Sequence, residues 1–217
     1  MNKPRIIIGL SGLAGAGKDT AADFLVAHHG FTKMAFGDAL KEELAEAFNV
    51  PVDFFNNRDS KETDCEELAL INCRNQNFND VQAHLLRQRP ALAFESRSPR
   101  WIMQQWGTEY RRKYYSQDYW TTQLAKRIES TVGNVVVTDV RFDDEADFIS
   151  RLDGHIWQIN RRNIAPVNSH SSERGIAPYF IDQNINNYGD IHSLHIICEL
   201  HLQSAIQHQS RCLWGHA

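Results

Sequence analysis

Short apolar runs alternate with amphipathic segments along most of the chain. Residues 5–10 and 135–137 are rich in β-branched side chains, as expected of strands that are buried on both faces of a parallel sheet. Weaker strand patterns occur at residues 31–36, 155–160 and 180–185. Apolar residues recur at helical spacing in residues 21–29, 39–48, 100–106, 120–129, 143–151 and 191–207. Strands that alternate with helices predict an α/β fold in which helices flank a parallel sheet.

A long irregular region interrupts this alternation. Residues 52–98 are rich in Asn, Arg and acidic residues, and they predict a surface insertion with short helices around residues 66–71 and 81–88. A chain of 217 residues fits one domain. We therefore predict a single domain over residues 1–217, with a helical insertion at about residues 37–130.

Composition excludes several classes of protein. A formal net charge of −4 disfavours a partner that is a nucleic-acid polymer. The 4 cysteines form no CxxC pair, which favours reduced thiols. No apolar run approaches the ~20 residues of a membrane span, and residues 1–5 lead directly into an apolar strand without a signal sequence. We expect a cytoplasmic protein.

The strongest chemical signal is a glycine-rich loop between the first strand and the first helix. Residues 12–18 fit the pattern GxxxxGK, in which backbone N–H groups surround phosphate oxygens at a helix N-terminus. Lys18 would reach the β- and γ-phosphates of a nucleotide. The loop predicts a P-loop phosphotransferase whose ATP-binding residues are Gly15, Ala16, Gly17, Lys18, Asp19 and Thr20.

The residue after Lys18 departs from the usual pattern. Asp19 stands where a Ser or Thr ligand of magnesium is usual, and Thr20 follows one residue later. The form GKxT is similar to nucleoside monophosphate kinases, in which magnesium is held largely through water and a distant aspartate. A second interpretation is that Asp19 only stabilises the positive end of the helix dipole.

A second candidate site follows the strand at residues 135–137. Asp139 and Arg141 would lie where the carboxyl ends of parallel strands meet ligands. An aspartate there can organise Mg²⁺, including through water, and an arginine can bridge phosphates. The alternative is that the pair only caps the following helix.

Further blocks occur in a characteristic order along most of the chain: Lys18-Asp19-Thr20, residues 36–41, 105–109, 118–120 and 139–142, Glu145, His170 and Ser172-Glu173. Their succession resembles the deoxynucleoside monophosphate kinases of bacteriophages and bacteria. That resemblance implies the nucleoside monophosphate kinase fold and transfer of the γ-phosphoryl group of ATP, with Mg²⁺, to a deoxynucleoside monophosphate.

The resemblance also implies roles for residues in the insertion. Lys41 would hold the acceptor nucleotide, Arg58 would approach its phosphate and Trp120 would pack by the nucleotide, while Arg141 would contact phosphates. Residue chemistry adds Arg100, because a guanidinium matches phosphate oxygens and keeps its charge. Residues 37–39 depart from the family pattern and residues 72–98 match none of it, so the accepted bases stay open.

Other interpretations remain at this level. A kinase of another small acceptor, such as dephospho-coenzyme A, would share the fold and the loop. A guanine-nucleotide switch would need NKxD and DxxG segments, which residues 56–59 and Asp139 imitate poorly. The helical spacing of His192, His195, Cys198 and His201 allows a metal site, although a polar helix face explains it more simply. The oligomeric state is open, with a homodimer as one option.

Overall fold

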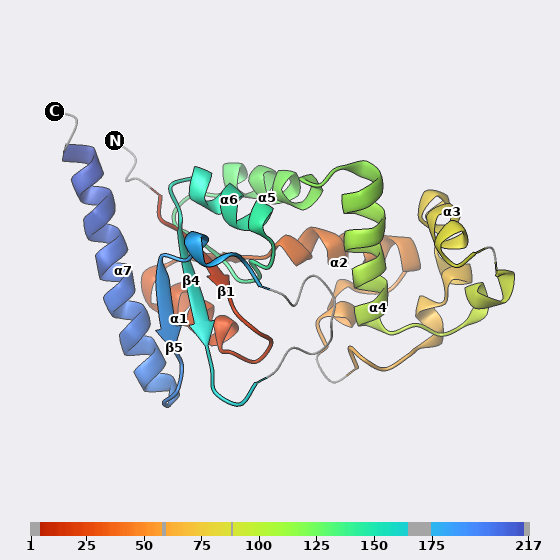
Figure 1. The fold of residues 1–217 in the computed structure, drawn as a ribbon, viewed down its shortest axis with the longest axis horizontal. Coiled ribbons are helices and arrows are strands. Elements are labelled where there is room, and N and C mark those ends of the chain that lie inside the picture. Colours follow the sequence, from red (N-terminus) through yellow and green to blue (C-terminus); the bar gives the residue numbers. More distant parts are fainter. Residues whose placement is uncertain (1–4, 58–59, 88, 165–174, 215–217) are drawn as a thin grey trace. The chain divides into compact units, whose positions relative to one another are not determined.

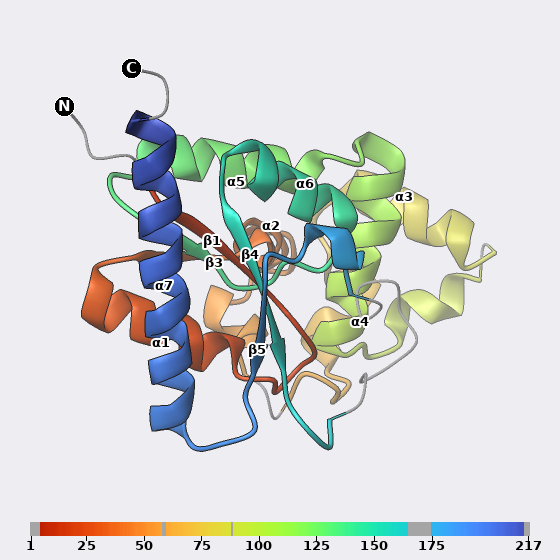
Figure 2. The same ribbon diagram turned by 60° about the vertical axis from the view of Figure 1, so that its left-hand side comes forward.

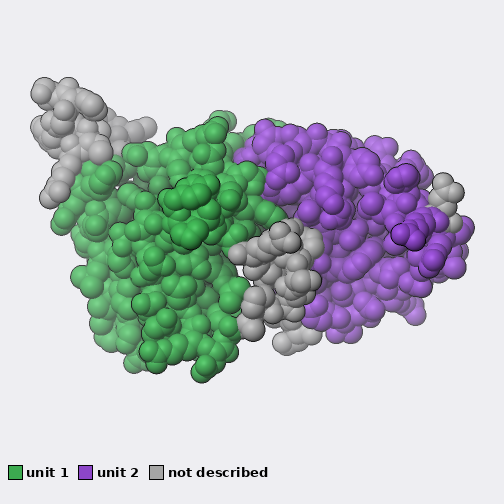
Figure 3. Space-filling model, viewed as in Figure 1, with its two compact units in different colours: residues 1–36, 124–217 green, residues 37–123 purple. Residues whose placement is uncertain are grey.

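The computed structural model describes residues 5–57, 60–87, 89–164 and 175–214, with residues 210–214 described by their backbone alone. The chain divides into two compact units (Figure 3). Unit 1 contains Met1–Phe36 and Leu124–Ala217, and unit 2 contains Gly37–Gln123. The division falls after the first residue of one helix and inside another, so unit 2 is inserted into the sequence of unit 1.

Unit 1 is built on a 5-stranded parallel sheet with strand order β2-β3-β1-β4-β5 (Figure 1). The strands are β1 (Ile7–Ser11), β2 (Thr32–Met34), β3 (Val135–Val137), β4 (His155–Asn160) and β5 (Gln183–Asn186). The predicted α/β class and the first four strands are confirmed. The last strand begins at Gln183, later than predicted, because Pro178 starts a short 3₁₀ turn at Pro178–Phe180.

Helices cover both faces of this sheet. Helices α1 (Lys18–His29) and α7 (Ile191–Trp214) lie side by side on one face (Figure 1 and Figure 2), and α6 (Asp143–Arg151) packs against the other. The predicted end of α1 is confirmed: Gly30 adopts a φ of 64°, and its N–H group donates to the carbonyl of Leu25. The terminal helix extends beyond the predicted residue 207.

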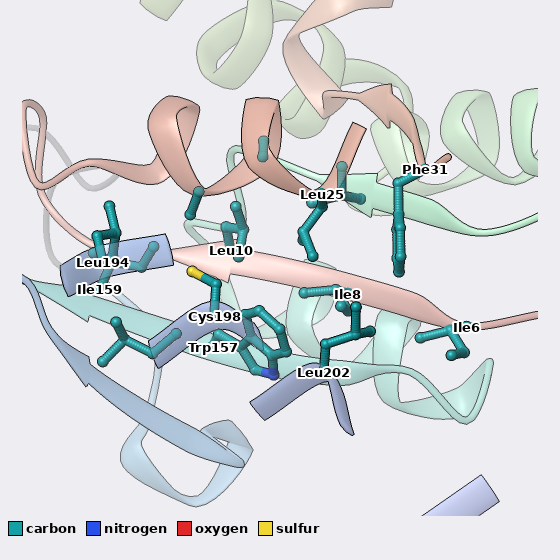
Figure 4. Packing of buried hydrophobic residues seen from close by; sticks show 14 of the residues in the cluster. Ile6, Ile8, Leu10, Leu25, Phe31, Trp157, Ile159, Leu194, Cys198 and Leu202 are labelled. Atoms are coloured by element: carbon teal, nitrogen blue, oxygen red, sulfur yellow. The ribbon is translucent and has the colours of Figure 1, made fainter. Parts of the chain in front are cut away.

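The core of unit 1 lies between the sheet, α1 and α7. Figure 4 shows Leu10 of β1, Trp157 of β4 and Cys198 of α7 together in this layer. Burial raises the pKa of the Cys198 thiol to about 12, so the sulfur stays protonated and apolar at neutral pH. Cys198 therefore serves as a core residue, and the described residues contain no cluster of three or more His, Cys, Asp or Glu side chains that could hold a metal.

Unit 2 is helical within its boundaries. Its elements include α2 (Phe36–Phe48, from Gly37 onward), α3 (Gln76–Leu85), α4 (Pro99–Gln104), a π-helix (Gln105–Tyr115) and the first part of α5 (Tyr119–Ser130). The helix predicted at residues 66–71 is two 3₁₀ turns. The helix predicted at residues 81–88 begins at Gln76, because Asn75 caps it by accepting a hydrogen bond from the N–H group of Phe78 at 2.9 Å.

The π-helix was not predicted, because its side chains do not follow the α-helical repeat expected of an amphipathic helix. In a π-helix each N–H group bonds five residues back, and the wider turn brings side chains four and five positions apart onto one side. Trp106 and Tyr110 accordingly both contact Phe78 of α3, with ring centroids 4.6 and 5.4 Å from its own. All three rings are buried, so they form part of the core of unit 2.

None of the helices in the described part of the chain is long and apolar enough to span a bilayer.

Candidate functional site

The glycine-rich loop lies where the sequence placed it, between β1 and α1. Gly12 adopts a φ of 134°, and a Cβ atom there would lie 2.3 Å from the carbonyl oxygen of Ile159. Gly17 adopts a φ of 109° at the start of α1, and a Cβ atom there would lie 2.4 Å from Nδ2 of Asn187. Both positions therefore require glycine, for backbone angle and for space.

The loop carbonyls are occupied by side-chain donors. Lys18 Nζ donates to the carbonyl oxygens of Gly12 at 2.7 Å and Leu13 at 2.9 Å, which folds the ammonium group back onto the loop. Farther along the loop, the carbonyl of Gly15 accepts a hydrogen bond from Arg161, which follows β4, at 3.3 Å. Two cationic side chains, Lys18 and Arg161, thus contact the loop, and both could pair with anionic phosphates.

The first turn of α1 carries the two residues that depart from the usual motif. Asp19 lies 3.4 Å from the ammonium group of Lys33, which also donates to Asp23 at 2.9 Å. Burial lowers the pKa of Lys33, but the two carboxylates outweigh it and raise the pKa overall. Thr20 follows in the same turn. This position suits both interpretations of Asp19, and its role stays a prediction.

The segment after β3 is fixed beside the start of the loop. The N–H group of Val140 donates to the carbonyl of Leu10, at 3.1 Å, which joins the segment to β1. The carboxylate of Asp139 accepts the backbone N–H group of Phe36 at 2.7 Å. Lys18, Asp139 and Arg141 are therefore brought to the same end of two neighbouring strands, although they lie far apart in sequence.

A buried carboxylate holds the backbone of Arg141. Glu145, only 3% exposed, accepts the N–H groups of Arg141 at 2.8 Å and Phe142 at 3.2 Å through the same oxygen. The sequence grouped Glu145 with this segment but gave it no task. Its position three residues into α6, where a glutamate can bond back to the helix start, was the available signal.

Sequence reasoning missed a second supporting residue, Asn187. Its side-chain Nδ2 donates to the carbonyl of Ala16 at 2.8 Å. The residue directly follows β5, and polar residues after parallel strands are candidates for ligand sites. The uncertain end of the last predicted strand concealed that signal.

Of the acceptor candidates, Lys41, Arg100 and Trp120 lie in unit 2, whereas Arg141 lies in unit 1. Lys41 Nζ donates to Asn56 Oδ1 at 2.8 Å and lies 3.9 Å from Asp38. Arg100 forms an ion pair with Glu62. Asn56 and Glu62 are six positions apart, and a chain of that length spans at most ~20 Å, so Lys41 and Arg100 contact the two ends of one short segment. Arg58 falls in that segment but outside the described residues, as do His170 and Ser172-Glu173.

Trp120 is part of the interior of unit 2. Its side chain is 4% exposed, and its indole N–H group donates to the carbonyl of Gly107 at 3.0 Å. A buried indole with its donor satisfied is held in one orientation. Its predicted contact with the nucleotide stays a prediction.

Another arginine is held by an aromatic cage, defined here as the rings of Trp106, Tyr110, Tyr115 and Tyr119. The guanidinium of Arg111 lies 4.8 to 5.5 Å from their ring centroids and donates to Glu43 at 2.7 Å. Glu43 also accepts hydrogen bonds from Trp106 at 2.7 Å and from Tyr119. Burial and this carboxylate raise the pKa of Tyr119 to about 12. The cage ties α2 to the π-helix and α5 within unit 2.

The loop, its lysine and the Asp139–Arg141 segment define a class of protein. A glycine-rich loop that joins β1 to α1, in a parallel sheet with β1 at its centre, is the phosphate site of a P-loop phosphotransferase. The fold and this site alone do not distinguish among the acceptors of such enzymes.

Comparison with known proteins identifies the family. A family model described as deoxynucleotide monophosphate kinase matches residues 59–197. The match covers more than half of the chain, and this chain belongs to the deoxynucleotide monophosphate kinase family. It is therefore a nucleotide phosphotransferase, as the sequence predicted. The matched residues begin after the glycine-rich loop, so the loop and the family model are separate lines of support.

Two curated relatives agree with this assignment. A protein of Acanthamoeba polyphaga mimivirus, provisionally named a deoxynucleotide monophosphate kinase, is 29% identical over 193 residues, covering 81% of this chain and 86% of the relative. The deoxynucleoside-5′-monophosphate kinase of Escherichia phage T5 is 24% identical over 258 residues, covering 93% of this chain and 99% of that relative. The crystal structure of TT1252 from Thermus thermophilus aligns with a TM-score of 0.49 at 16% identity, covering 93% of this chain and 98% of that chain, and this weak likeness adds nothing to the assignment.

Proposed function

We propose that the chain transfers the γ-phosphoryl group of ATP to the 5′-phosphate of deoxynucleoside monophosphates, yielding ADP and deoxynucleoside diphosphates. The observation that carries the proposal is the convergence of Lys18, Asp139 and Arg141 at the ends of β1 and β3, in a member of this kinase family.

The donor site accounts for most of the chemistry. Phosphoryl transfer depends on positioning and on positive charge around the phosphate oxygens. Backbone N–H groups of Gly15 to Thr20 would hold the phosphates of ATP, with Lys18 moving from the loop carbonyls onto them. Arg141 would bridge donor and acceptor phosphates. No catalytic base is needed, because the acceptor phosphate already carries the attacking oxygen.

Mg²⁺ fits the oxygen donors beside this loop. Asp139 offers a carboxylate, the kind of hard ligand that Mg²⁺ prefers, and the N–H group of Phe36 orients it. When bound, the ion would neutralise charge on the β- and γ-phosphates. We assign Asp139 to the metal, with water between them where the carboxylate does not reach.

Unit 2 is our candidate for the acceptor-binding insertion of a single kinase domain. Lys41 and Arg100 flank the segment that contains Arg58, and these three cations would bind the acceptor phosphate. Trp120 would contribute to the wall beside the nucleotide. Two anionic substrates must approach each other, so cations are needed at the acceptor end as well as at the donor end.

We further propose that the enzyme acts on free nucleotides in the cytoplasm. The net charge of −4 gives no general attraction to nucleic-acid polymers. Assembly as a homodimer is an option that light scattering on the purified protein would decide.

The function is tested by a coupled assay of ADP release with Mg-ATP and a panel of deoxy- and ribonucleoside monophosphates. We expect at least one deoxynucleoside monophosphate to be converted to its diphosphate, identified by chromatography. Consumption of dephospho-coenzyme A with no turnover of any monophosphate would instead support a dephospho-coenzyme A kinase. ATP binding with no turnover of any acceptor would support a nucleotide-binding switch.

A further inference from the structure

Asn187 joins the end of the sheet to the phosphate loop. Its backbone N–H group donates to the carbonyl of Asn160 at 2.8 Å, which continues the pairing of β5 with β4 by one residue. Its side-chain Nδ2 donates to the carbonyl of Ala16 at 2.8 Å, across 171 positions of sequence. The backbone hydrogen bond fixes the position of the Asn187 main chain, and from that position the side-chain amide reaches the loop.

The contact determines the orientation of one peptide group. The carbonyl of Ala16 and the N–H group of Gly17 belong to the same planar trans peptide, so they point in opposite directions. Drawing the carbonyl toward Asn187 directs the N–H group of Gly17 away from it. That N–H group stands at the start of α1, where the first N–H groups have no acceptor within the helix and are suited to bind an anion.

Gly17 and Asn187 are complementary in shape. A Cβ atom on Gly17 would lie 2.4 Å from Nδ2 of Asn187 and 3.5 Å from the side chain of Leu194 in α7. The amide can approach the Ala16 carbonyl only because residue 17 lacks a side chain. Ala16 itself is fully buried, so its carbonyl depends on a donor within the protein.

We propose that Asn187 is a positioning residue for the donor nucleotide, which holds the Ala16–Gly17 peptide so that its N–H group faces the donor phosphates. The inference rests on the proposed function, because it assigns a task at the same donor site. Asn187 contacts the donor loop, whereas the proposed acceptor residues Lys41 and Arg100 belong to unit 2. Loss of the Asn187 amide should therefore weaken the binding of ATP and leave the binding of the deoxynucleoside monophosphate unchanged. A purely structural contact would lower stability without a selective effect on ATP.

Two substitutions isolate the amide donor. Asn187→Ala removes it, and Asn187→Asp keeps the shape but turns a carboxylate oxygen toward the carbonyl of Ala16. For the alanine variant we expect the KM for ATP and the dissociation constant of Mg-ATP to rise about two- to tenfold, as for loss of one neutral hydrogen bond. The aspartate variant should bind Mg-ATP more weakly still. The KM for the monophosphate should stay within about twofold.

Asn186→Asp is the matched control, because it adds the same charge one residue earlier on an exposed side chain. We expect it to change neither constant by more than about twofold. Thermal unfolding of every variant shows whether the fold is kept. Equal losses for both substrates, an unchanged affinity for Mg-ATP, or the same loss in Asn186→Asp would each overturn the inference.

Equilibrium dialysis with Mg-ATP separates this inference from the proposed function. If the wild-type protein converts no monophosphate, the proposed function fails. The dissociation constants still decide the role of Asn187: weaker binding of Mg-ATP in both variants supports it, and wild-type binding overturns it.

Discussion

Removal of the Glu145 carboxylate should both destabilise unit 1 and impair catalysis. The side chain is 3% exposed, and one of its oxygens accepts the N–H groups of Arg141 and Phe142 at 2.8 and 3.2 Å. A hydrogen bond to a charged group contributes about 1.5–3 kcal/mol. Both N–H groups belong to partly exposed residues, so water replaces some of the loss. We expect Glu145→Ala to lower the free energy of unfolding by about 2–4 kcal/mol.

The variant Glu145→Gln makes this reasoning sharper. Since both N–H groups meet one oxygen, the carbonyl oxygen of a glutamine can accept both bonds, while the negative charge is removed. We expect a cost of about 1 kcal/mol. For a chain of this length each kcal/mol lowers Tm by about 2–4 °C, so alanine should lower Tm by about 4–16 °C and glutamine by about 2–4 °C.

Circular dichroism melting and steady-state kinetics at saturating substrates measure the two effects. Because Arg141 loses its backbone anchor, kcat should fall by about tenfold or more in Glu145→Ala and much less in Glu145→Gln. The control is Asp147→Ala, on the same helix, which removes only an exposed pair with Arg151. A Tm within about 2 °C of wild type together with unchanged kcat in Glu145→Ala would refute the argument.

Three further predictions concern the donor lysine, the acceptor end and a buried thiol. Lys18→Ala should fold normally but lose turnover by several orders of magnitude in the coupled assay. The control Lys113→Ala, which removes a 60% exposed lysine, should keep its turnover. Near-normal turnover of folded Lys18→Ala would argue against the assignment of the loop. Lys41→Ala should raise the KM for the monophosphate about tenfold to a hundredfold and leave that for ATP unchanged, and a rise confined to ATP would move Lys41 to the donor site. The pKa of Cys198 is raised from 9.0 to about 12, so the unfolded chain loses this proton first and the stability from the neutral thiol is present below pH 9 and lost as pH rises toward 12. Urea unfolding at pH 8 and pH 10.5 should therefore show a smaller loss of stability in Cys198→Ala than in wild type, and equal losses would contradict the assignment.

Features that depend only on neighbouring residues could be predicted from the sequence. Strand, loop and helix around residues 12–18 are one continuous pattern, and its glycines have a local cause in their backbone angles. The same holds for α6, whose predicted bounds agree with the structure, and for the end of α1 at Gly30. Local patterns were sufficient to predict the α/β class and the P-loop, while the order of family-like blocks indicated the kinase family.

Other features depended on tertiary structure, because they join residues that are distant in sequence. Asn187 reaches Ala16 and Asp139 accepts the N–H group of Phe36 only after strands separated by more than a hundred residues pair in one sheet. The π-helix and its cage around Arg111 form because Glu43 and the rings pack against one another, which no repeat in the sequence encodes. The types of residue in the candidate site could be recognised from local sequence patterns. The positions of the groups that support the phosphate loop were decided by packing and long-range hydrogen bonds.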